Sequence, residues 1–154
     1  MTDSTFTVER STTVAAPPSA IYPLLVDFRR WQEWSPWEGL DPAMRRTYSG
    51  APSGRGAVYA WSGNRKAGQG RMEITEATPD EQVAIDLAFD RPFRSRNVIR
   101  LALRPQDGGT GVTWAMTGPR PLLMRLLGFV FSMDKIVGKD FDRGLAQLKA
   151  VAEA

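Results

Sequence analysis

The side chains that could do chemistry in this sequence are restricted, because it contains no histidine and no cysteine. This excludes a Ser-His-Asp triad, a thiol nucleophile, and imidazole or thiolate ligands for a transition metal. Any reaction would rest on carboxylates, Tyr, Lys, Arg or Ser. The acidic residues Glu73, Glu76, Asp86 and Asp90 do not converge on one face of the predicted strands. We therefore predict no catalytic carboxylate pair, and we assign no catalytic residue, metal site or cofactor.

A set of aromatic, methionine and leucine side chains is better suited to holding an apolar molecule, because ligand pockets are mostly apolar with few polar anchors. Tyr59 would add a hydrogen-bond donor if its ring faces inward. A packed core would have the same composition, so both interpretations stay open for every one of these residues. The candidate ligand-binding residues are Trp34, Trp37, Tyr59, Trp61, Phe89, Phe93, Trp114, Met116, Phe131, Phe141 and Leu145.

The stretch from Phe28 to Trp37 holds three of the five tryptophans. Trp31 and Trp34 are three positions apart, so on a short helix they would face the same way. Pro36 would end that helix. The rings could form a hydrophobic plug that seals one end of the core, or the rim of an apolar pocket.

Alternating apolar and polar residues predict an antiparallel sheet with one buried face. Ile99 and Leu101, for example, would face inward while Arg100 and Arg104 face water, where we expect them to pair with Asp86. Turn residues separate the strands, and the glycines at 106–111 indicate a hairpin turn, since no helix follows them. The predicted strands span 5–14, 44–49, 57–62, 69–77, 82–90, 96–104 and 111–118, with short helices at 18–26 and around 28–35.

The clearest helical period lies at the C-terminus, from Met133 to Ala154. Five apolar residues recur there at intervals of three or four and form one stripe, which needs a cover. They are Val137, Phe141, Leu145, Leu148 and Ala152. Gly138 and Gly144 each cost about 1 kcal/mol in a helix relative to Ala. Either something approaches the helix closely at these points, or the cost is simply tolerated.

Length and composition predict one domain over residues 1–154, with a net charge of +3. The 20 basic residues are interspersed with 17 acidic ones, so we expect no nucleic-acid partner and a solvated arginine-rich sheet face. No signal peptide or membrane span is apparent, and we expect a cytoplasmic protein without stable membrane insertion. The apolar stretch 121–133 could act as a lid or form a homodimer contact.

The order of elements resembles the helix-grip, START-like (SRPBCC) superfamily, which includes Bet v 1-type proteins and polyketide cyclase/dehydrase-type proteins. Residues along nearly the whole chain carry this resemblance: Ala16-Pro17-Pro18, Asp27 to Trp37, Tyr59 to Asn64, Gly68 to Met72, Val112 to Trp114, and Met133 to Leu145. It implies an α+β fold in which a curved seven-stranded antiparallel sheet wraps around a long C-terminal helix. Two short helices lie between strands one and two. It also implies a cavity that often takes an apolar ligand.

These observations favour a non-catalytic protein that binds a small hydrophobic or aromatic molecule between sheet and helix. An alternative is a cyclase or dehydratase in which Tyr59 and an arginine orient a reactive polyketide-like chain, since positioning alone can lower a barrier by several kcal/mol. A third possibility is a partner-binding domain that uses the 121–133 surface. A polar pair inside the cavity would favour the enzyme.

Overall fold

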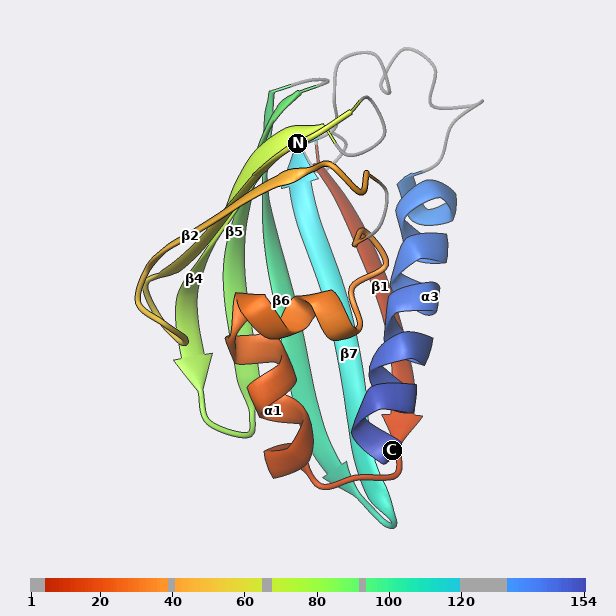
Figure 1. Ribbon diagram of the computed structural model, residues 1–154. Helices are drawn as coiled ribbons and strands as arrows, with labels where there is room; N and C mark the ends of the chain where they lie inside the picture. Colours follow the sequence, from red (N-terminus) through yellow and green to blue (C-terminus); the bar gives the residue numbers. More distant parts are fainter. Residues whose placement is uncertain (1–4, 39–40, 65–67, 92–93, 120–132) are drawn as a thin grey trace.

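The computed structural model describes residues 5–38, 41–64, 68–91, 94–119 and 133–154 (Figure 1). Seven strands form one antiparallel sheet in the order β1-β7-β6-β5-β4-β3-β2. The predicted strands are confirmed, with ends that differ by a few residues. Their bounds are β1 (Thr5–Val14), β2 (Arg45–Gly50), β3 (Ala57–Ser62), β4 (Gln69–Thr78), β5 (Gln82–Arg91), β6 (Ser95–Gln106) and β7 (Gly109–Pro119).

Three helical segments accompany the sheet: α1 (Pro18–Val26), the 3₁₀ helix η2 (Phe28–Glu33) and α3 (Met133–Glu153). Figure 1 shows α3 running alongside β1, with α1 and η2 crossing the same side of the curved sheet. Because β6 and β7 alternate buried and exposed residues, only one face of the sheet needs this cover. The fold is therefore the expected helix-grip arrangement. None of the described helices is long and apolar enough to span a membrane.

The two glycines of α3 mark points of close approach. A Cβ on Gly144 would lie 2.7 Å from Trp114 Cζ3 and 2.8 Å from Pro36 Cδ. A Cβ on Gly138 would collide with the guanidinium of Arg10. Of the two explanations that the sequence left open, the structure confirms close approach, by the sheet and the loop at Gly144 and by a β1 side chain at Gly138.

The outer face of the sheet carries the charged side chains, as predicted, but with different partners. Arg100 Nη1 lies 3.6 Å from Glu76 Oε2 and donates to Gln82 Oε1 at 3.1 Å. The expected pair of Arg100 with Asp86 is wrong, because the strand register places Asp86 opposite Val98. Arg104 lies beyond the end of the β5–β6 pairing, opposite Gly111 of β7. Alternation identified the face but did not fix the register.

The end of α3 is tied to the turn between β1 and α1. Glu153 Oε2 accepts hydrogen bonds from the Ala15 backbone N–H at 2.8 Å and from Lys149 Nζ at 2.6 Å. Lys149 also donates to the Thr13 carbonyl at 2.8 Å. Since β1 is an edge strand, this contact also occupies one of its free carbonyls.

This arrangement predicts an acid-sensitive contribution to stability. The bond from Ala15, followed by that from Lys149, holds the pKa of Glu153 below its ordinary value of 4.5. A depressed pKa stabilises the folded state above the unfolded-state value and ceases to do so as the pH falls through the folded-state value. Urea unfolding should therefore show wild type more stable than Glu153→Gln at pH 6, with the difference shrinking below pH 4.5. A difference that persists unchanged at pH 3 would contradict this.

Candidate functional site

Aromatic side chains form a continuous path of contacts across the inner face of the sheet. The path begins on α3 and ends on β5, through the rings of Phe141, Trp114, Trp31, Phe28, Tyr59, Trp61 and Phe89. Successive ring centroids lie 4.2, 6.3, 5.6, 6.0, 5.9 and 5.6 Å apart. Strands β3, β5 and β7, helix η2 and α3 all contribute, so the fold brings together rings that are distant in sequence. We call these seven rings, together with Trp34 and Trp37, which meet Trp114 edge-on, the aromatic wall.

Trp31 and Trp34 form its closed centre. Both are almost completely buried, at 2% and 0% exposure, and their centroids are 4.6 Å apart. Trp31 Nε1–H donates to the Leu25 carbonyl at 2.9 Å, and Trp34 Nε1–H donates to the Leu24 carbonyl at 2.8 Å. The last carbonyls of a helix lack partners within it, so the two indoles complete the C-terminal end of α1. This geometry fits the plug interpretation for these two rings.

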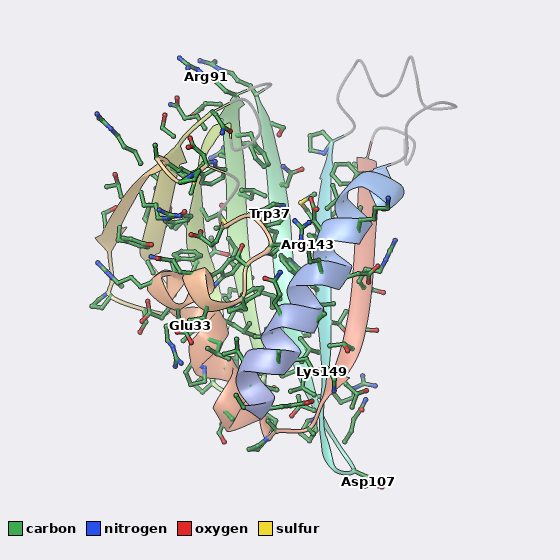
Figure 2. The ribbon with its side chains drawn as sticks, turned by 45° about the vertical axis from the view of Figure 1, so that its right-hand side comes forward. Glu33, Trp37, Arg91, Asp107, Arg143 and Lys149 are labelled. Atoms are coloured by element: carbon green, nitrogen blue, oxygen red, sulfur yellow. The ribbon has the colours of Figure 1, made fainter. Side chains whose placement is uncertain are left out.

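Trp37 lies farther out and is only partly buried. Its Nε1–H donates to Asp140 Oδ2 on α3 at 3.2 Å, and its ring meets Trp114 edge-on at 5.5 Å. Arg143 of α3 donates to the Pro36 carbonyl at 2.9 Å. Figure 2 shows Trp37 and Arg143 close together where the loop after η2 meets this helix. The loop and α3 are thus held together by polar bonds around a ring that keeps some exposure.

Trp114 sits between β7 and α3. Its ring is fully buried and stacks on Phe141 with an interplanar angle of 9°. Among the residues that the structure describes, its Nε1–H has no hydrogen-bond partner. Met116 follows on the same strand face, and Leu145 lies one turn beyond Phe141 on α3. Both side chains are buried, with exposed fractions of 4% and 2%.

The other end of the path is more open. Tyr59 is buried, whereas Trp61 and Phe89 are only partly buried. Gly70 lies opposite both Trp61 and Phe89 in the strand register, and a Cβ there would lie 2.8 Å from Trp61 Cη2. The missing side chain lets Trp61 lie over β4 and meet Phe89 edge-on at 87°. Phe93 and Phe131, the remaining predicted site residues, lie outside the described residues.

A polar group adjoins these rings. Tyr59 Oη donates to Glu38 Oε2 at 3.3 Å, and Arg46 Nη2 lies 2.7 Å from Glu38 Oε1. The Arg46 and Glu38 side chains are 25% and 14% exposed. Burial, then the charge of Glu38, raises the pKa of Tyr59 well above its ordinary value of 10. The hydroxyl is the donor in this bond to Glu38.

Sequence reasoning missed Glu38 and Arg46. Glu38 follows the tryptophan-rich stretch in a loop, where no periodicity assigns a direction. Arg46 carried a weak signal, because it shares the strand parity of Met44 and Tyr48, whose side chains are buried or half-buried. An inward arginine needs an anionic partner. The sequence contains 17 acidic residues, so it does not identify Glu38 as that partner.

Comparison with known proteins places this geometry in context. A family model described as polyketide cyclase / dehydrase and lipid transport matches residues 5–153. The chain belongs to this family. A search of curated proteins gives no match. Family membership agrees with the inward rings and the long C-terminal helix. The family description names both enzymes and lipid transport, so membership alone does not choose between the two.

Solved structures share the fold of this family member over nearly their whole length. Protein CV1439 from Chromobacterium violaceum is 16% identical with a TM-score of 0.69, over 96% of this chain and 97% of that chain. The Aha1 dimer from Colwellia psychrerythraea is 16% identical with a TM-score of 0.68, and the match covers 96% of each chain. Ara h 8.0201 is 15% identical with a TM-score of 0.65, and the match covers 96% of this chain and 97% of that chain. At such low identity these likenesses show the helix-grip fold and nothing about activity.

Proposed function

We propose that the protein binds a small hydrophobic or aromatic molecule between the sheet and α3. The observation that carries this proposal is the incomplete burial of Trp37, Trp61 and Phe89. These rings belong to the inner aromatic wall, yet they are less buried than Trp34, Trp114 and Phe141. An apolar molecule placed against them would remove their remaining exposed area from water.

The family description supports the proposal, since it includes lipid transport. The chemistry of the wall also supports it. Stacked and edge-on rings offer flat surfaces to a planar ligand, and the hydroxyl oxygen of Tyr59, whose proton goes to Glu38, offers an orienting acceptor next to them. Trp34, Met116 and Leu145 would then support the wall from behind, while the ligand contacts the partly exposed rings.

The test is binding of the neutral fluorescent probe N-phenyl-1-naphthylamine to wild type and two variants. Phe89→Ala removes a partly buried ring of the proposed site and should raise the Kd about tenfold. Val98→Ala is the control, because Val98 is an exposed apolar residue on the outer face of the next strand. It should leave the Kd unchanged.

Two results would overturn the proposal: no saturable binding by wild type, or equal Kd values for both variants. Native mass spectrometry of protein purified from its own host adds an independent check. A retained small molecule would identify the ligand directly.

The polar group at Glu38 favours a second candidate, a cyclase or dehydratase. The N–H groups of Arg46 that Glu38 does not engage, next to Tyr59, could hold the carbonyl groups of a poly-β-ketone chain. Closure of such a chain by an aldol step followed by loss of water gives a product lighter by one water. Incubation with a poly-β-ketone thioester, followed by mass analysis, distinguishes the two candidates. An enzyme forms the product that is lighter by one water faster than the reaction without protein does, whereas a carrier leaves the rate of that reaction unchanged.

A further inference from the structure

Asn97 of β6 is a polar residue on the inner, apolar face of the sheet. It alternates with exposed residues in the same phase as Ile99 and Leu101, so all three side chains point inward. Asn97 is only 6% exposed. A buried carboxamide costs free energy unless its oxygen and its amino group have hydrogen-bond partners. The role of Asn97 therefore depends on what its carboxamide can bond to.

The carboxamide makes little use of the protein around it. Its Nδ2 donates to Ser95 Oγ at 3.5 Å, which is a long and weak hydrogen bond. Within the described ranges of the chain, the Oδ1 acceptor and the second Nδ2–H have no hydrogen-bond partner. A carboxamide can accept two hydrogen bonds and donate two. Most of this capacity is thus left for a group that is not a described part of the protein.

Gly118 of β7 gives the carboxamide its place. A Cβ on this glycine would collide with Asn97 Oδ1. Gly118 is buried and follows Met116 on the inner face of β7. The missing side chain therefore lets the amide of Asn97 lie against the inner face of the sheet, on the same side as the aromatic wall.

The strand register places this amide beside the partly buried rings of the proposed ligand site. Ser95 lies directly opposite Phe89, and Asn97 is the next inward residue of β6, diagonal to Phe89. Trp61 meets Phe89 edge-on at a centroid distance of 5.6 Å. Diagonal neighbours on one face of a sheet lie within reach of long side chains. A molecule that covers Phe89 can therefore also reach the carboxamide of Asn97.

We infer that Asn97 is a specificity-determining residue of this site, and that the ligand is an aromatic molecule with an uncharged hydroxyl group, such as a phenol. This inference rests on the proposed function and narrows its ligand class. A hydroxyl is both donor and acceptor, so it can donate to Oδ1 or accept from the free Nδ2–H. Ser95, Leu87 and Ile99, next to Asn97 on this face, carry no charge, so a neutral group avoids the cost of burying an unpaired ion.

The experiment compares 2-naphthol with 2-methylnaphthalene, which carry a hydroxyl and a methyl group of similar size at the same position. Displacement of N-phenyl-1-naphthylamine gives the Kd of each compound for wild type and for Asn97→Ala. The variant should shift the ratio of the two Kd values about tenfold in favour of 2-methylnaphthalene. Because the ratio is compared between two proteins, the difference in hydrophobicity between the compounds cancels.

Gln82→Ala is the matched control. It removes a carboxamide from the outer face of β5, where Gln82 accepts a hydrogen bond from Arg100. It should leave the ratio unchanged. A measurement on wild type makes the test independent of how well Asn97→Ala folds. Bound 2-naphthol should move the side-chain ¹⁵N resonance of Asn97 downfield, and 2-methylnaphthalene should not; through-space signals to Gly118 assign that resonance.

An unchanged ratio in folded Asn97→Ala, or a wild-type resonance that 2-naphthol does not move, would overturn the inference and leave the proposed function intact. An equal shift of the ratio in Gln82→Ala would also overturn it, since the effect would not depend on the inner carboxamide. The same holds if the fluorescent probe binds and neither naphthalene displaces it. If the probe itself does not bind, the proposed function fails.

Discussion

Trp34→Ala is expected to lower the free energy of unfolding by about 3–5 kcal/mol. The ring is fully buried and contacts both Trp31 and Trp114, so its removal leaves a cavity beside these two rings. It also removes the donor that satisfies the Leu24 carbonyl at the end of α1. A domain of this size typically has a total stability of only about 5–15 kcal/mol, so the loss would be a large fraction of it.

Urea denaturation followed by circular dichroism measures this loss. Gln32→Ala is the control on the same short helix: its side chain is exposed and donates one surface hydrogen bond to Tyr48. That variant should lie within about 1 kcal/mol of wild type. If Trp34→Ala also lies within that range, the indole does not hold α1 and η2 against the sheet.

Gly144→Ala is expected to lower the free energy of unfolding by about 1–2 kcal/mol, although alanine is the better helix former by about 1 kcal/mol. The new methyl group would meet the Trp114 ring and Pro36 at less than 3 Å. Both neighbours are buried, and neither can yield without repacking the stacked pair of Trp114 and Phe141.

Gly138→Ala is the matched control in the same helix. Its methyl group would meet the far end of the Arg10 side chain, which is 27% exposed and can move. This variant should lose at most the surface pair of Arg10 with Asp142, worth about 1 kcal/mol or less, and gain helix propensity. Thermal unfolding should therefore rank Gly138→Ala near or above wild type and Gly144→Ala clearly below it; the reverse order would contradict the packing described for α3.

The sequence predicted the fold well because the relevant signals are local. Ile99 and Leu101 alternate with Arg100, and Phe141 and Leu145 recur at helical spacing, so each segment reveals its own structure and its buried face. The same patterns placed Tyr59, Trp61 and Phe89 on one side of the sheet. Family resemblance then supplied the order in which the segments assemble.

What the sequence could not supply depends on register and on the path of loops. The partner of Arg100 changed from Asp86 to Glu76 through a displacement along the strands that alternation does not encode. The pair of Glu38 with Arg46 depends on where the loop after η2 runs. The Trp114 N–H, which has no hydrogen-bond partner in the described part of the chain, could not be predicted at all, since its surroundings arise from the packing of rings from three separate segments.

The pairing of β1 with β7 has a consequence for how the chain folds during synthesis. Thr7 and Thr117 face each other across these strands, 110 positions apart, with their hydroxyls 3.3 Å from each other. The strands from β2 to β7 follow one another as neighbours and can pair soon after they emerge from the ribosome. β1 must wait until β7 has been made, and contacts so distant in sequence slow folding. β1 is thus the last of the seven strands to gain its neighbour, so its apolar residues stay exposed to water longest during folding.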